Sequence, residues 1–240
     1  MSAATSTSEM VAEPKTRRAK SRFWRRLAWL VLALGLAPFV LTLAYAVIPP
    51  LSLPMIGRAV MLQPVDRRWT PLDKIAPSVP LAVLSSEDAR FCQHWGVDFD
   101  AISLVMRQGG KNGPSRGAST VAMQVAKNLY LWPLPTAMRK PLEIPLALWI
   151  DLVWSKQRVI EVYLNIAQWG DGIYGIEAAA QHYYKKPAAA LSPREAALLA
   201  VALPNPIRRD AGAPTRRLRN LAGLIAGRAQ SAPETLACLK

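Results

Sequence analysis

An apolar segment near the N-terminus limits what this chain can fold into more strictly than any other feature. The segment LAWLVLALGLAPFVLTLAYAVI, Leu27–Ile48, contains no charged residue. As an α-helix it would extend roughly 33 Å, which is enough to cross the hydrocarbon core of a bilayer. Trp29 and Tyr45 lie near its two ends, where aromatic residues favour the membrane interface. We therefore predict one transmembrane helix over residues 27–48.

Basic residues directly before this segment predict its orientation. The arm of residues 1–26 carries a cluster of lysines and arginines: Lys15, Arg17, Arg18, Lys20, Arg22, Arg25 and Arg26. Such an arm stays in the cytoplasm, so the residues after Ile48 are expected on the far side of the membrane. A cleaved signal peptide is the alternative, but its apolar core is usually only about 7 to 15 residues long. The longer segment, with no clean cleavage site after it, favours an uncleaved anchor.

The chain is strongly cationic, with 30 Lys and Arg against 16 Asp and Glu and a net charge of +14. Such an excess indicates a polyanionic partner, although a merely solubilising surface is the alternative. A domain outside the cytoplasm meets no nucleic acid. We therefore expect a lipid headgroup or a phosphorylated lipid as the partner.

Cysteine and histidine are scarce, which limits metal chemistry. Cys92 and Cys238 lie far apart and have no neighbouring Cys or His at zinc-binding spacing. They could pair with each other, but the sequence favours two unpaired thiols. His94 and His182 are the only histidines, so a histidine-rich metal site is excluded.

The rest of the chain is patterned mainly as helices, with few strand-like alternations and no repeats. We predict a proline-rich, irregular connector over 49–80, a mainly α domain over 81–206 and a basic tail over 207–240. The helices expected within the domain cover 81–95, 99–108, 120–132, 139–170, 174–186 and 192–206. The tail could be an amphipathic helix resting on anionic lipid or a solvated end.

Capping and helix-breaking residues refine these expectations. Asp100 is a candidate N-cap of the helix over 99–108, and Ser192 opens a capping box in the last helix. Pro141 and Pro145 are expected to break the long helix near its start.

The first candidate site is the acidic stretch SSEDARFCQHWGVDFDAI. If the helix is continuous, Glu87, Phe91 and His94 share one face, and Asp88 turns toward the side of Phe91. A carboxylate beside an aromatic ring is partly desolvated, which raises its pKa and makes it a usable base. A solvated acidic face with a satisfied histidine is the alternative.

The second candidate site follows the glycine-rich loop over 109–119. Thr120, Gln124 and Lys127 recur at helical spacing, with Asn128 beside them, and a helix N-terminus with these donors can bind a phosphate. The lysine does not directly precede the threonine as in a Walker loop, so a nucleoside triphosphatase is disfavoured. An ordinary capped amphipathic helix is the alternative.

The third candidate site is the sequence RKPLE. Arg139 and Lys140 could neutralise a developing pyrophosphate while Glu143, four residues after the arginine, orients them. The alternative is a surface ion pair, which contributes little.

The order of the motifs resembles the peptidoglycan glycosyltransferases of family 51 over about residues 81–206. The matching motifs are EDARFCQHWGVD, GASTVAMQVAKN, RKPLE, KQRVIEVYLN and GIYGIEAAAQHYYKK. The resemblance implies a mainly α, lysozyme-like glycosyltransferase domain in the periplasm, anchored in the bacterial inner membrane. It also implies polymerisation of lipid II into β-1,4-linked strands by inversion, with release of undecaprenyl pyrophosphate. The sequence ends at Lys240, so we expect a monofunctional member without a penicillin-binding domain.

The same resemblance assigns roles to individual residues. Glu87 would be the general base toward the 4-hydroxyl of the acceptor sugar, and Glu143 the second catalytic carboxylate, which assists departure of the pyrophosphate. The substrate-binding positions would be Asp88, Phe91, His94, Ser119, Thr120, Gln124, Lys127, Asn128, Arg139 and Lys140. The expected partners are lipid II, the growing glycan strand, the membrane and other cell-wall synthesis proteins, and not nucleic acid. No cofactor or metal cage is predicted, but a divalent cation, Mg²⁺ or Mn²⁺, stays open.

Departures from the family pattern and other functions limit this interpretation. Met123 and Ala122 stand where the family usually has glutamine and threonine, and the two prolines near Glu143 are expected to shift its helix. A lytic muramidase and a non-enzymatic membrane-anchored scaffold are the alternative functions. The apolar run over 142–154 could dip into the bilayer or form a buried core helix.

Overall fold

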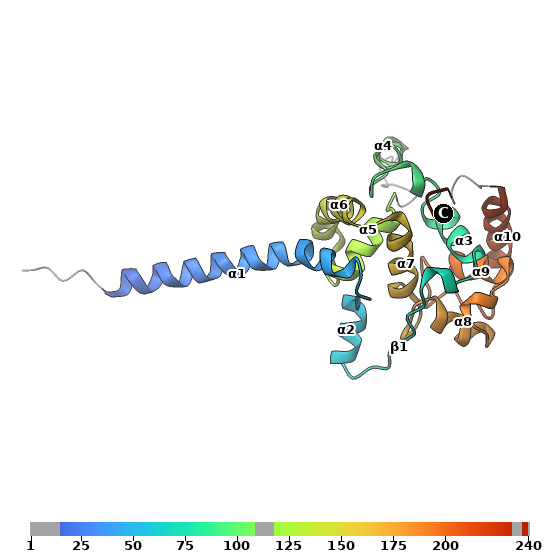
Figure 1. Cartoon of the computed structure of the whole chain (residues 1–240), viewed down its shortest axis with the longest axis horizontal. Coiled ribbons are helices and arrows are strands. Elements are labelled where there is room, and N and C mark those ends of the chain that lie inside the picture. Colours follow the sequence, from blue (N-terminus) through green and yellow to red (C-terminus); the bar gives the residue numbers. More distant parts are fainter. Residues whose placement is uncertain (1–14, 109–117, 232–236, 240) are drawn as a thin grey trace, which may run out of the picture. The chain divides into compact units, whose positions relative to one another are not determined.

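The computed structural model describes residues 15–108, 118–231 and 237–239, and the described chain is mainly α-helical (Figure 1). The chain divides into two compact units, residues 1–40 and 41–240. The predicted glycine-rich loop over 109–119 lies almost entirely outside the described residues.

The first unit contains most of helix α1, Lys15–Tyr45. Its stretch Arg22–Tyr45 is long and apolar enough to cross a membrane, and an 18-residue window within it has a mean hydropathy of 2.3. Pro38 lies inside the helix, and membrane helices tolerate proline. The candidate membrane span predicted from the sequence is therefore a continuous helix that ends at Tyr45 rather than at Ile48.

The second unit begins with the last turn of α1, which is bonded to later parts of the chain. The indole of Trp154 donates a hydrogen bond to the Thr42 carbonyl at 2.7 Å. The Arg158 guanidinium donates to the Tyr45 carbonyl at 2.8 Å. These carbonyl groups lie in the last turn of α1, where the helix hydrogen bonds end, and the Thr42 carbonyl also accepts from the Ala46 amide at 3.1 Å.

The predicted irregular connector over 49–80 is ordered, which corrects the expectation from its prolines. Helix α2 spans Leu53–Val60, the 3-10 helix η1 spans Leu72–Lys74, and α3 begins at Ser78. Pro54 lies in the first turn of α2. A proline there loses nothing, because the first N–H groups of a helix have no intrahelical partner.

The core of the second unit is built from α3, α5, α7, α8 and α9. These helices span Ser78–Glu87, Val121–Ala126, Lys156–Ile166, Ile176–Tyr184 and Pro193–Ala202. Helix α5 packs against α7, and α3 packs against α9. The buried positions are mostly alanine, valine, leucine and isoleucine, which lets neighbouring helices approach closely. The capping box predicted at Ser192 is confirmed, with Glu195 as its second member.

Helix α3 ends at Glu87, so the predicted helix over 81–95 is wrong in its second half. Asp88 leaves the helix, and the short 3-10 helix η2 follows at Phe91–Gln93. Glu87 and His94 therefore do not share a helix face. The physical reason is the Asp88 side chain, which bonds to groups elsewhere in the fold and competes with continuation of the helix.

Helix α4, Phe99–Gln108, is capped by a different aspartate from the predicted one. The Ala101 amide donates to Asp98 Oδ1 at 2.9 Å. Asp100 instead forms an ion pair with Arg90 at 2.9 Å. The N-cap thus lies immediately before the first helical residue, where a side-chain oxygen reaches the free amides.

Helix α6, Thr136–Val153, continues through Pro141 and Pro145, so the prediction that these prolines break it is wrong. The predicted long helix over 139–170 is interrupted instead after Val153, and Ser155 caps the next helix, α7. Each proline removes one helix hydrogen bond, and packing of α6 against α5 offsets that loss. Leu146, Ala147 and Ile150 are buried whereas Leu148 and Leu152 are exposed, so the run over 142–154 is a core helix on one side only.

A small three-stranded sheet, which the sequence did not predict, lies beside the helices. Its order is β1–β3–β2, from Asp66–Arg67, Ile173–Tyr174 and Gln168–Gly170. Strand β1 is parallel to β3, and β2 is antiparallel to it. Strands of two or three residues are too short to show an alternating pattern.

Helix α10, Arg216–Ser231, packs against α3 and α9 (Figure 1). Leu218, Ala222 and Ile225 bury its apolar stripe. The tail was predicted to be either an amphipathic helix on lipid or a solvated end. Over α10 it is neither, because the apolar stripe of this helix packs against the domain.

Candidate active site

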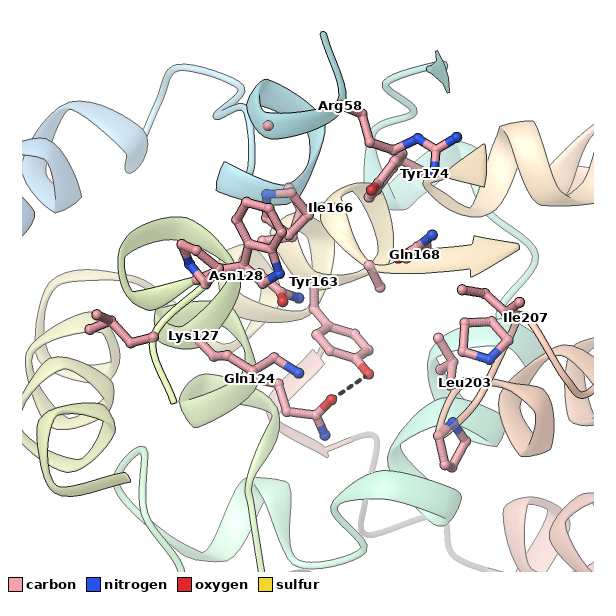
Figure 2. Close-up of a pocket in the computed structure, with 18 of the residues that line it drawn as sticks. Arg58, Gln124, Lys127, Asn128, Tyr163, Ile166, Gln168, Tyr174, Leu203 and Ile207 are labelled. Carbon is pink, nitrogen blue, oxygen red and sulfur yellow. Dashed lines mark hydrogen bonds between the residues drawn. The ribbon is translucent and has the colours of Figure 1, made fainter. Parts of the chain in front are cut away.

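A cavity of about 680 Å³ opens between α2, α5, α7 and the chain after α9 (Figure 2). Lys127 and Asn128, at the start of the π-helical turn η3 (Lys127–Leu131), line it together with Gln124 from α5. Arg58 and Arg139 also line it, and no carboxylate does so among the described residues. π-helical turns recur at functional sites. The charge of this wall suits an anionic ligand.

Lys127 is a half-buried cation in the cavity wall. Burial, and then the nearby Arg139 guanidinium, lower the pKa of Lys127 from its ordinary value. Figure 2 shows its side chain on the cavity wall beside Gln124. A bound phosphate group would compensate both the burial and the repulsion.

Glu143 lies behind this wall with none of its side chain exposed. Arg139 pairs with one carboxylate oxygen, and Lys140 Nζ lies 2.8 Å from the other. Lys140 also donates to Ser119 Oγ at 3.0 Å. The structure thus brings together Ser119, Arg139, Lys140 and Glu143.

Glu87 is half-buried at the C-terminal end of α3 and approaches the cavity through Gln124. Gln124 Nε2 donates to Glu87 Oε2 at 3.1 Å. Burial raises the pKa of Glu87 above the ordinary glutamate value, while the bond from Gln124 and the charge of Lys127 act against the rise. A carboxylate with a raised pKa accepts a proton more readily near neutral pH, as a general base must.

The other residues of the first motif form a framework behind the site. Asp88 Oδ1 lies 2.9 Å from His94 Nε2, and Asp88 Oδ2 accepts from the Val121 amide at 2.9 Å. Phe91 is fully buried, with the Lys156 ammonium 4.8 Å from its ring centre. These residues, predicted to bind substrate, join the segment after α3 to the start of α5 and do not line the cavity.

Thr120 also belongs to this framework. Its hydroxyl donates to the Gly96 carbonyl at 2.5 Å and accepts from the Met123 amide, so Thr120 is the N-cap of α5. Gly96 adopts a positive φ of 69°, and a side chain there would collide with the Ala147 carbonyl. Glycine is therefore required at this turn.

Met123, which stands where the family usually has glutamine, lies in the core. Met123 is only 3% exposed, whereas Gln124 reaches the cavity. A thioether at a buried position avoids the cost of burying an unpaired amide. The departure from the family pattern therefore leaves the cavity wall intact.

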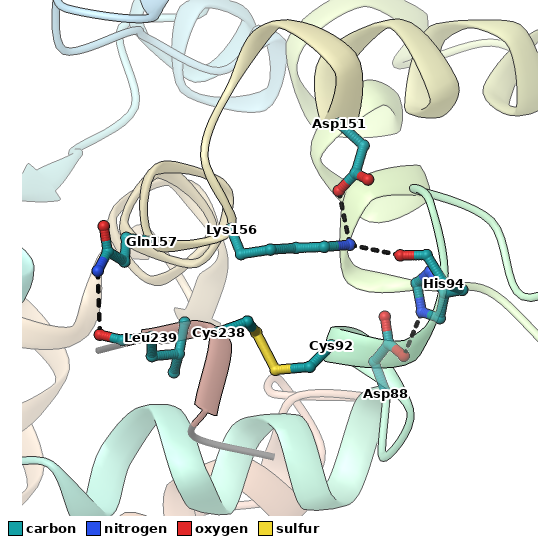
Figure 3. The surroundings of a disulfide bond; sticks show 8 residues. All are labelled: Asp88, Cys92, His94, Asp151, Lys156, Gln157, Cys238 and Leu239. Atoms are coloured by element: carbon teal, nitrogen blue, oxygen red, sulfur yellow. Dashed lines mark hydrogen bonds and ion pairs between the residues drawn. A yellow bond between two sulfur atoms is a disulfide. The ribbon is translucent and has the colours of Figure 1, made fainter. Parts of the chain in front are cut away.

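A disulfide joins Cys92 to Cys238, which corrects the prediction of two unpaired thiols (Figure 3). The bond ties η2 to the described C-terminal residues 237–239, where Gln157 donates to the Leu239 carbonyl at 3.1 Å. A separation of 146 residues leaves no local pattern from which the pairing could be predicted.

Sequence reasoning missed several residues of the cavity wall, among them Arg58 and Tyr163. Arg58 lies in the segment predicted to be a connector, and it pairs with Asp171 at 2.7 Å. Tyr163 lies within the motif KQRVIEVYLN, which was noted only for its resemblance. The helical spacing of that motif with a tyrosine on its buried face is the signal that could have found it.

The divalent cation left open by the sequence has no evident ligand set. Over residues 15–108, 118–231 and 237–239, no three or more His, Cys, Asp or Glu side chains converge to hold a metal ion. The positive charge at the cavity comes instead from lysine and arginine side chains.

Comparison with known proteins gives consistent matches along the chain. The family model described as Transglycosylase matches residues 55–230, from α2 to α10. The biosynthetic peptidoglycan transglycosylase of Agrobacterium fabrum is 50% identical over 217 residues, which cover 90% of this chain and 96% of that protein. The protein of the same name from Brucella suis is 47% identical, covering 88% and 95%. That from Rhodopseudomonas palustris is 49% identical, covering 84% and 90%.

Proposed function

The chain belongs to the transglycosylase family as a peptidoglycan glycosyltransferase, and on that premise we propose that it polymerises lipid II into β-1,4-linked glycan strands with release of undecaprenyl pyrophosphate. Its mainly α, lysozyme-like domain is the one expected from the sequence, as is the single N-terminal candidate membrane span found in the described residues. The observation that carries the proposal is the link from Glu87 through Gln124 to a cationic cavity.

Glu87 serves as the general base in this proposal. It removes the proton from the 4-hydroxyl of the acceptor N-acetylglucosamine as that oxygen attacks the anomeric carbon of the growing strand. The bond to the diphosphate breaks, and the α-linked donor becomes a β-1,4 linkage by inversion. The raised pKa of Glu87 supports this role, because a stronger base takes the proton more readily.

The cations around Glu143 stabilise the leaving diphosphate. Lys127 and Arg139 line the cavity, and Lys140 adjoins Ser119. Charge that develops on the diphosphate oxygens is stabilised by donors held in place before the reaction. Glu143 acts by fixing Arg139 and Lys140, to which both of its oxygens are bonded.

The domain is proposed to lie in the periplasm, with the N-terminus in the cytoplasm. The basic arm before the candidate span supports this orientation. The Cys92–Cys238 disulfide supports it independently, because structural disulfides persist in oxidising compartments. The substrate is carried on a lipid, so an anchored enzyme would meet it at the membrane surface.

The proposal is tested with the full-length protein in proteoliposomes that contain labelled lipid II. We expect glycan polymer from the native protein and at least a roughly 100-fold lower rate from Glu87→Gln. Asp73→Asn, which changes an exposed acid in η1, is the matched control and should keep the native rate.

Two results would contradict the proposal. Normal polymerisation by Glu87→Gln would remove Glu87 as the base. Soluble muropeptides released from sacculi, without polymer from lipid II, would indicate the alternative muramidase.

A further inference from the structure

A buried tyrosine hydroxyl ends a chain of side chains that leads to Glu87. Tyr163 of α7 is only 1% exposed, and its hydroxyl donates to Gln124 Oε1 at 3.1 Å (Figure 2). Gln124 of α5 then donates through Nε2 to Glu87 Oε2, also at 3.1 Å. Three helices thus each contribute one member of the chain.

The chemistry of the amide gives this arrangement a direction. A glutamine side chain has a donor end and an acceptor end, and a carboxylate can only accept. The amide must therefore turn Nε2 toward Glu87 and Oε1 toward Tyr163. Burial raises the pKa of Tyr163, so its hydroxyl keeps the proton that it donates. The opposite amide orientation would set Oε1 against the carboxylate.

We propose that Tyr163 is a positioning residue that holds the Gln124 amide in this orientation and thereby orients the Glu87 carboxylate for its reaction. The inference rests on the proposed role of Glu87 as general base. Gln124 fixes Oε2, and among the described parts of the chain the opposite oxygen, Oε1, accepts only a 3.4 Å bond from Ser86 Oγ. That weakly held oxygen is the one available to an acceptor hydroxyl.

Other charges around the chain act on Glu87 independently of Tyr163. Lys127 and Arg209 both favour ionised Glu87. Asp88, like Glu87, acts on the buried phenol of Tyr163 and favours its neutral form. Replacing tyrosine by phenylalanine leaves all of these charges in place. A change in the titration of Glu87 in that variant therefore reports on the Gln124 amide.

Removing the hydroxyl has a defined consequence for the base. Gln124 Oε1 loses its partner, so only the bond to the carboxylate still orients the amide. A hydrogen bond to the ionised form lowers the pKa of an acid, so weakening of this bond raises the pKa of Glu87. The acid limb of the kcat/KM profile then moves to higher pH, and kcat falls because the carboxylate is less well oriented.

The experiment compares full-length Tyr163→Phe, Gln124→Met and the double variant in the lipid II assay. For Tyr163→Phe we expect kcat to fall about tenfold, KM to change less than about twofold and the acid limb to rise by about half a pH unit. The double variant should be no slower than Gln124→Met, since the tyrosine acts only through the glutamine. Additive losses, or a native rate and profile for Tyr163→Phe, would overturn the inference.

Tyr184→Phe is the matched control, because it removes a hydroxyl that donates to the Ala211 carbonyl, and Tyr184 is not among the cavity residues. It should keep the native kcat and pH profile. Glu87→Gln is measured in parallel to separate two failures. An active Glu87→Gln refutes the role of Glu87 as the base. An inactive Glu87→Gln together with a native-like Tyr163→Phe refutes only the positioning role of Tyr163. If Tyr163→Phe does not fold, Gln124→Met carries the test, and an unshifted acid limb in it overturns the inference.

Discussion

Arg139 and Glu143 form an ion pair across one turn of α6, and the pair holds a fully buried carboxylate behind the cationic wall of the cavity. Lys140 completes the group on the second carboxylate oxygen. The carboxylate fixes two cations, and the cations offset the cost of burying it. The pair between Arg58 and Asp171 is different, because the Asp171 side chain is 71% exposed.

Glu143→Ala should therefore destabilise the domain as well as slow the enzyme. We expect the free energy of unfolding to fall by about 3 kcal/mol, because removing one member of a buried pair leaves the other charges uncompensated. Polymerisation should fall too, since Arg139 is no longer held at the cavity. Denaturant unfolding and the lipid II assay measure the two effects.

Asp171→Asn is the control for that variant, and it should cost less than about 1 kcal/mol because its pair is at the surface. Equal losses of unfolding free energy in Glu143→Ala and Asp171→Asn would contradict the expectation that the buried pair contributes more to stability than the exposed pair.

Features whose partners lie within a helical turn were predictable from the sequence. Glu143 with its two cations is one case, and the capping box at Ser192 is another, because each needs only local helix geometry. Prediction failed where the partner is distant. Asp88 leaves α3 to bond to the start of α5, and Cys92 pairs with Cys238, and no local pattern specifies either contact.

Proline misled the sequence reasoning in two ways. The prolines of 49–80 suggested an irregular connector, although Pro54 lies in the first turn of α2. Pro141 and Pro145 suggested a break, although α6 continues through them. Local preference penalises proline by a fixed amount, whereas packing of the finished helix can offset it. Local ion pairs such as that of Arg139 with Glu143 could thus be predicted, but Arg58 and the framework behind the cavity could not.

The raised pKa of Glu87 has a consequence for stability. The folded state binds this proton more tightly than the unfolded chain, whose glutamate titrates near its ordinary value of 4.5. Stability is therefore expected to fall as the pH rises from about 4.5 through the raised pKa. Glu87→Gln should lack this loss and melt at a higher temperature than the native protein at neutral pH, with the difference closing in acid.

Thermal unfolding of both proteins across this pH range measures the effect. The contrary result is a native protein that becomes more stable than Glu87→Gln as Glu87 ionises. It would mean that the fold favours the ionised carboxylate, which contradicts a raised pKa of Glu87.

The disulfide should stabilise the domain through the long loop that it closes. Cys238→Ser is expected to lower the free energy of unfolding by about 2 to 5 kcal/mol. Dithiothreitol should reproduce the effect in the native protein and leave the double variant Cys92→Ser, Cys238→Ser unchanged. In intact cells, both cysteines should resist alkylation until a reductant is added. Free thiols in cells would count against the periplasmic placement.

The lowered pKa of Lys127 predicts a basic limit to activity. The ammonium must be charged to hold the diphosphate, so kcat/KM should decline as the pH rises through a pKa below the ordinary lysine value of 10.5. Lys127→Arg keeps its charge at higher pH and should remove this limb, at some cost in rate because the guanidinium has a different shape. Lys127→Met should lose at least about 100-fold at every pH.

Profiles of kcat/KM between about pH 6 and pH 10 distinguish these outcomes, with Lys74→Met, an exposed lysine of η1, as the control that keeps the native profile. An unchanged basic limb in Lys127→Arg would assign that limb to another group.

Because burial contributes most to the lowered pKa of Lys127 and Arg139 is the next cause, Arg139→Gln should move the basic limb of the enzyme with native Lys127 toward higher pH. Such a shift would link the two cations in one diphosphate site.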